Sequence, residues 1–153
     1  MKLFNNTLIL GLTLLLGSCG KKQIIASEEG IRQNVIANEH LQGQILWVKN
    51  KKKELRAEIL LTNNYSKPLV FPRESIQMRF DGKRGLITKN KFVGKIPSNG
   101  MIKGELSAEF YPPIDKEGSL EVKFMNLTLV DSAGHKIIRN VENLTLELEL
   151  GKN

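Results

Sequence analysis

From residue 41 onward, apolar and polar residues alternate along the chain with a period of two rather than 3.6. The clearest runs lie at 54–62, 76–80, 102–110 and 144–150. Successive side chains of a β-strand point to opposite faces, so each run predicts a strand with one apolar and one solvated face. Because no long amphipathic helix interrupts these runs, they indicate antiparallel sheets packed over a common core.

Turn-forming residues separate the predicted strands. A polar stretch at 63–68 ends in proline before Leu69-Val70-Phe71, and Asp81-Gly82 follows the run at 76–80. Proline cannot donate a backbone hydrogen bond, so Pro112-Pro113 stops the strand at 102–111. Residues 131–134 join the last two long segments as a hairpin. About seven to nine short strands at this spacing predict an all-β, immunoglobulin-like antiparallel β-sandwich.

Two segments have less regular patterns. The apolar residues of 120–130 change phase after Phe124, and a bulge near Met125-Asn126 would return them to one face. The alternative is a central strand that is buried on both sides. Residues 29–40 fit either one helical stripe or a weak edge strand, and the sequence leaves this choice open.

The first residues have the features of an export signal. Lys2 provides a short positive start, and an apolar run follows at 8–16. A permanent membrane-spanning helix needs about 20 apolar residues, so this run is too short to be one. It has the length of the apolar region of a secretory signal peptide. The run ends in Leu16-Gly17-Ser18-Cys19, and Cys19 is the single cysteine of the chain.

This quartet resembles the lipobox of bacterial lipoproteins. The resemblance implies that Leu16, Gly17 and Ser18 form the signal-peptidase motif and that the Cys19 thiol becomes a thioether to diacylglycerol, with palmitate-type acyl chains. One acyl chain holds a protein weakly, whereas additional chains make a stable tether. The chain then divides into a signal peptide at 1–18, a lipidated tether at 19–30 and a sandwich domain at 31–153.

The same resemblance predicts a location in the cell envelope, on a membrane bound through the lipid on Cys19. Aspartate directly after the lipidated cysteine often marks retention in the inner membrane. Gly20 occupies that position here. In a cell with two membranes, this favours the outer membrane, with the domain on its periplasmic or surface face.

Three segments of the domain resemble an immunoglobulin-like extracytoplasmic family of the DUF4352 type. They are the strand end and turn at 62–69, the turn at 96–100 and the Gly-x-Leu-x-x-x-Phe strand at 104–110. The resemblance covers roughly residues 41–131 and implies a β-sandwich in small secreted or lipid-anchored bacterial proteins. The chain departs from this pattern through a basic insertion at 83–95 and the lack of a cysteine pair. Because the shared motifs are structural, they imply very little about activity.

The chain carries 23 lysines and arginines against 16 aspartates and glutamates, a formal net charge of +7. Positive residues cluster at 49–53 and along an excursion at 81–95. A possible patch for an anionic partner comprises Lys51, Lys52, Lys53, Lys83 and Arg84. An acidic envelope protein or an anionic polymer fits such a patch, while export and an aromatic content of 6% disfavour nucleic acid. The alternative is a set of solvated loops that keep the domain soluble.

No catalytic motif is visible, and no cofactor or metal site is predicted. The two histidines, His40 and His135, lie apart, and His135 follows the predicted hairpin turn as an exposed residue. Four apolar residues could suggest a soft-metal or ligand site, but we expect them to pack in the core. These are Trp47, Met78, Met101 and Met125.

The sequence therefore predicts a lipid-anchored envelope protein whose sandwich is a non-catalytic module for binding or assembly. Two alternatives remain open. One is a sandwich that resembles a protease inhibitor and offers an exposed loop. The other is an envelope hydrolase or metal-handling protein whose site is built from scattered residues.

Overall fold

The computed structural model describes residues 40–51 and 53–151. The predicted signal peptide, Cys19, the tether and the segment 29–39 lie outside the described residues. The predicted boundaries of the three parts of the chain therefore remain predictions.

The described chain is built of β-strands, joined by one short 3-10 helix, η1 (Arg73–Ser75). Three of the twelve strands contain two residues, and the nine longer ones agree with the expected number. The predicted all-β class is confirmed. The strands are β1 (Leu41–Asn50), β2 (Glu54–Asn63), β3 (Leu69–Val70), β4 (Ile76–Phe80), β5 (Lys83–Arg84), β6 (Leu86–Asn90), β7 (Lys95–Ile96), β8 (Gly100–Glu109), β9 (Gly118–Phe124), β10 (Leu127–Val130), β11 (Lys136–Val141) and β12 (Leu144–Leu150).

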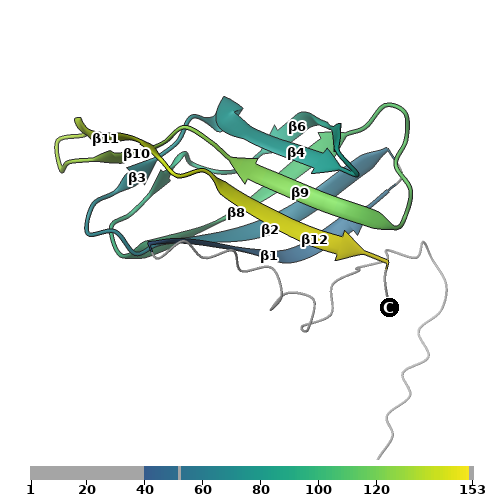
Figure 1. Cartoon of the computed structure of the whole chain (residues 1–153), viewed down its shortest axis with the longest axis horizontal. Helices are drawn as coiled ribbons and strands as arrows, with labels where there is room; N and C mark the ends of the chain where they lie inside the picture. The colour runs from purple at the N-terminus through teal and green to yellow at the C-terminus, as the bar shows by residue number, and fades with distance from the viewer. Residues whose placement is uncertain (1–39, 52, 152–153) are drawn as a thin grey trace, which may run out of the picture.

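The strands form three antiparallel sheets of four strands each. The long sheet has the order β1-β2-β8-β6, and the facing sheet has the order β12-β9-β4-β5. These two sheets lie over one another as the two layers of the sandwich (Figure 1). The end sheet, β11-β10-β3-β7, extends the sandwich at the end where β1 begins (Figure 1).

The core lies between the long and facing sheets and is lined by alternate residues of each long strand. In β2, for example, the buried Leu55, Ala57, Ile59 and Leu61 alternate with half-buried residues. Phenylalanine rings fill the centre in edge-to-face pairs, a favourable geometry for aromatic rings. The Phe92 and Phe124 rings lie 5.4 Å apart, and the Phe71 and Phe124 rings lie 5.8 Å apart.

In 120–130 the structure shows a change of sheet and, for the second half of the segment, the central strand buried on both sides that the sequence offers as the alternative. β9 ends at Phe124 in the facing sheet, and β10 begins at Leu127 in the end sheet. Asn126 adopts a positive φ of 55° at the junction. The chain thus changes sheets there, from β9, whose burial alternates, to β10, which lies between β11 and β3. All four residues of β10 are buried.

The basic segment 83–95, which the sequence predicts as an inserted excursion, is built into the sandwich. It supplies β5 to the facing sheet, β6 to the long sheet and β7 to the end sheet. β6 pairs with β8 from Leu86 opposite Glu109 to Asn90 opposite Leu106. The segment is therefore part of the sandwich and contributes a strand to each of its sheets.

Two of the predicted core residues lie elsewhere, and a third, Met125, is only half-buried and outside the core cluster. The register of β1 shifts between Ile45 and Trp47, which places Trp47 opposite Glu58 on the solvated face. There the half-buried indole donates a hydrogen bond of 2.9 Å to the Glu58 carboxylate. Met101 is 63% exposed near the start of β8, whereas Met78 is fully buried as predicted.

Candidate functional site

The two parts of the predicted basic patch lie at the same end of the sandwich. Glu54 follows the β1–β2 turn and lies opposite Glu109 in the register of β2 and β8. Phe80 precedes the β4–β5 turn and lies opposite Leu120 in the register of β4 and β9. The loop 110–117 joins Glu109 to the start of β9, so both turns lie beside it. We call this the basic end; in Figure 1 it is the end to which the β4 arrow points. Its exposed cations include Lys51, Lys53, Lys83 and Arg84, while Lys52 lies outside the described residues.

Acidic groups also lie at the basic end. Asp81, Asp115 and Glu117 are exposed there. Asp81 accepts a hydrogen bond of 2.8 Å from the backbone N–H of Ser119, which fixes the β4–β5 turn to the start of β9. The basic end is therefore a mixed surface with a positive excess, and not a continuous cationic face.

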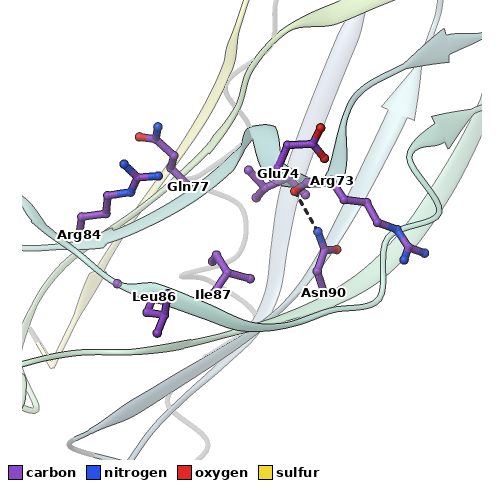
Figure 2. Close-up of a pocket in the computed structure, with 9 residues that line it drawn as sticks. Arg73, Glu74, Gln77, Arg84, Leu86, Ile87 and Asn90 are labelled. Atoms are coloured by element: carbon purple, nitrogen blue, oxygen red, sulfur yellow. Dashed lines mark hydrogen bonds between the residues drawn. The ribbon is translucent and has the colours of Figure 1, made fainter.

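A groove of about 650 Å³ opens along one side of the sandwich, between β4 of the facing sheet and β6 of the long sheet (Figure 2). Arg84 and Gln77 lie at the end of the groove nearest β5. Asn90 lies at the other end, where its side chain donates a hydrogen bond of 3.2 Å to the Arg73 carbonyl. The lining residues are Arg73, Glu74, Ile76, Gln77, Arg84, Gly85, Leu86, Ile87 and Asn90.

The apolar part of the groove comes from β6. Leu86 is 67% exposed, and Ile87 is half-buried against the core. Figure 2 shows the Ile87 side chain directed from β6 toward β4. Gly85 leads into β6, and a Cβ there would lie 2.7 Å from the Phe110 ring. The tight packing at Gly85 thus fixes the position at which β6 begins.

Both strands that border the groove have unpaired edges among residues 40–51 and 53–151. β6 is an edge strand, paired only with β8. β4 pairs with β5 only at Arg79 and Phe80, and the Met78 carbonyl accepts from Gly85 N–H at 2.9 Å. Alternate backbone N–H and C=O groups on the outer side of an edge strand are open to another chain.

Ion pairs remove two nearby lysines from the candidate surface. Lys91 Nζ lies 2.7 Å and Lys89 Nζ lies 3.6 Å from the Glu105 carboxylate on the outer face of the long sheet. The hydrogen bond with Lys91 lowers the pKa of Glu105 and raises the pKa of Lys91. Arg84 has no such ion pair among the described residues, so its charge is available to a partner.

The histidines lie in separate environments. The His40 ring lies against Tyr65, with centroids 4.7 Å apart. His135 is exposed in the β10–β11 hairpin, as predicted, and its Nδ1 lies 3.2 Å from Asp131 Oδ2. Within the part of the chain that the structure describes, no group of three or more His, Cys, Asp or Glu residues could hold a metal ion.

Sequence reasoning identified Arg84 but missed the rest of the groove. Leu86 and Ile87 were a usable signal, because two adjacent apolar residues inside a basic segment are atypical of a solvated loop. The groove itself has no sequence signature, since it is formed by two strand edges that belong to different sheets. In the described ranges, no helix has the length and apolar character needed to cross a membrane.

No family profile matches the chain, and no curated protein matches it. Solved structures that match the chain include the following two. A candidate lipoprotein (ycdA) from Bacillus subtilis has a TM-score of 0.51 and 16% identity, over 75% of this chain and 38% of that one. The GAE domain of yeast GGA1 has a TM-score of 0.46 and 17% identity, over 77% of this chain and 97% of that domain. At these identities, the first similarity supports the β fold alone.

Proposed function

We propose that the chain is a lipid-anchored protein of the cell envelope and that its β-sandwich is a non-catalytic module that binds a partner. Leu16-Gly17-Ser18-Cys19 after a short apolar run supports the anchor. The B. subtilis protein with a similar β fold is itself described as a candidate lipoprotein, which agrees with this proposal. In a cell with two membranes, Gly20 after the cysteine favours the outer membrane.

The position of the chain start supports a binding role for the basic end. The lipid on Cys19 would precede His40 in the chain, and β1 begins at the end of the sandwich away from the basic end. β1 then runs for ten residues, or about 33 Å, to the turn that carries Lys51 and Lys53. The described chain therefore enters the sandwich at the end opposite the basic end.

The open groove beside Arg84 is the observation that carries the binding role. It combines an exposed leucine, an unpaired strand edge and a cation without an ion pair among the described residues. Apolar area with a few placed polar groups is the usual composition of a binding site.

The anchor is tested by changing the cysteine alone. Cys19→Ala is expected to abolish incorporation of labelled fatty acid and to leave an unprocessed precursor or a soluble product. Lys53→Ala, a change in the exposed β1–β2 turn, should incorporate label as the wild type does. Continued labelling of Cys19→Ala would contradict the lipid anchor.

The binding role is tested separately in living cells. A photo-crosslinking amino acid at residue 86, in the groove, is expected to form a discrete adduct with an envelope component. The same group at residue 137, an exposed isoleucine of β11, serves as the control. Absence of adducts from residue 86, or identical adducts from both positions, would contradict a binding role for this surface.

A further inference from the structure

We propose, building on the binding role above, that the groove accepts an extended segment of a partner protein that pairs with the edge of β6 and places an acidic side chain at Arg84. The partner segment would become an additional strand of the long sheet, next to β6. This mode of recognition takes affinity from the backbone and selectivity from side-chain pockets.

The backbone of β6 provides the first part of the argument. β6 has five residues, about 17 Å of strand, and its side away from β8 has no strand partner in the described ranges. Proteins commonly protect such edges with short strands, lysines, bulges or a covering segment, and β6 has Lys89 and a register shift between Ile87 and Lys89. Beside these features, the edge still borders an open groove of about 650 Å³, which leaves room for another strand.

The side chains of the groove provide the second part. Leu86 exposes two thirds of its surface, and Ile87 beside it closes the bottom of the groove against the core. An apolar side chain of an incoming strand would cover Leu86 and remove it from water. This coverage would explain the exposed apolar residue at the start of this edge strand.

The charged residues of the groove indicate where along the partner segment an acidic side chain would lie. Arg84 lies at the β5 end of the groove without an ion pair among the described residues, and an arginine can hold a carboxylate through two parallel hydrogen bonds. At the opposite end, the exposed Glu74 stands beside the exposed Arg73, so the two charges offset one another and that end has no net attraction for a carboxylate. The acidic residue of the segment is therefore expected at the Arg84 end, and a neutral stretch along the rest of β6.

The proposal is tested with a synthetic peptide on the mature, detergent-solubilised protein. The probe alternates glutamate and valine in one half, and threonine and valine in the other half. Fluorescence anisotropy should show saturable binding with a Kd below about 1 mM. A peptide with lysine in place of glutamate should bind at least about tenfold more weakly. A peptide methylated on alternate backbone nitrogens should also bind at least about tenfold more weakly, because it cannot form the backbone hydrogen bonds of strand pairing.

Matched variants locate the site. Arg84→Glu should weaken binding at least about tenfold, whereas Lys83→Glu, next to it but outside the groove, should have a much smaller effect. Leu86→Asp should abolish binding, whereas Val93→Asp, at a residue 69% exposed and outside the groove, should not. Circular dichroism of each variant should retain the wild-type strand signal, which separates lost binding from lost folding.

Several results would overturn the proposal. These are no binding at millimolar peptide, equal binding of the glutamate and lysine peptides, undiminished binding of the methylated peptide, or equal losses in Arg84→Glu and Lys83→Glu. If residue 86 still crosslinks a partner in cells while the peptide results go against strand pairing, the binding role stands and this mode of recognition fails. If no crosslink forms, the binding role itself fails.

Discussion

Gly104 of β8 lies directly against the ring of Phe92, so a Cβ at residue 104 would come within 2.7 Å of three ring carbons. Both residues are buried. The Phe92 ring is held from the other side by Phe124, at 5.4 Å, and by Phe71, at 6.2 Å. Glycine at 104 therefore provides the space into which the central aromatic cluster packs.

Gly104→Ala is expected to destabilise the domain by about 1–3 kcal/mol, because the ring cannot withdraw from the added methyl group without displacing its aromatic neighbours. Urea unfolding measures this loss. In a Phe92→Leu background, the smaller side chain leaves room for the methyl group, so the same substitution should be less costly. Equal losses of unfolding free energy in both backgrounds would show that the contact between residues 104 and 92 does not cause the destabilisation.

Asn63 joins two turns at the end of β2. It is fully buried, and its Nδ2 donates hydrogen bonds of 2.9 Å to the carbonyls of Lys67 and Pro97. Its Oδ1 accepts a hydrogen bond of 2.9 Å from the backbone N–H of Tyr65. Asn63→Asp places a carboxylate against two carbonyl oxygens, and we expect a loss of at least about 2 kcal/mol in the free energy of unfolding.

The neighbouring asparagine provides the control for this prediction. Asn64 is exposed, and its backbone N–H bonds to the His40 carbonyl. Asn64→Asp keeps that bond and should change the free energy of unfolding by less than about 0.5 kcal/mol. If the two aspartate variants are equally stable at neutral pH, Asn63 does not fix the turns together.

Glu105 predicts a pH dependence of stability. Its pKa is lowered in the folded state, first by the hydrogen bond from Lys91. A lowered pKa means that the stabilisation is fully present above the unfolded-state pKa, about 4.3, and is lost as the pH falls through the lower folded-state value. Glu105→Gln should therefore cost about 0.5–1 kcal/mol at pH 7, and its difference from the wild type should shrink below about pH 4.

Urea unfolding from pH 7 to pH 3 checks this dependence. Glu147→Gln on the solvated side of β12 is the matched control, and it should change stability by less than about 0.5 kcal/mol at pH 7. A constant difference between Glu105→Gln and the wild type across this range would be evidence against the Glu105–Lys91 pair.

Asp131 closes the β10–β11 hairpin through hydrogen bonds from backbone N–H groups. Its Oδ1 accepts from Ala133 at 2.9 Å and from His135 at 2.8 Å. The backbone N–H of His135 is the main cause of the lowered pKa of Asp131. His135→Ala keeps that N–H, so the pKa of Asp131, followed by NMR titration, should stay below its ordinary value. A return to the ordinary value would mean that the imidazole is the cause.

The sequence predicted the strands that have one buried and one solvated face. β2, β4, β8 and β12 show this alternation along most of their length, and each was located within a few residues. The chain's change of sheet at Asn126 could not be predicted, because alternation shows which residues share a face and not which sheet they join. The two-residue strands are too short to show a period at all.

The candidate site could be predicted only in part. Arg84 was found because charge clusters are visible in a sequence, but Leu86 and the edge of β6 were not. β6 is mostly exposed on both faces, so its residues do not alternate between apolar and polar. The groove also depends on the distance between two sheets, which is set by core packing far from the residues that line it.

The intact mass of the protein extracted from membranes decides whether Cys19 carries a lipid. With a lipid anchor, we expect a mature chain that begins at Cys19 and carries the added mass of a diacylglycerol thioether. A chain that begins at Met1 with an unmodified Cys19 thiol would contradict it.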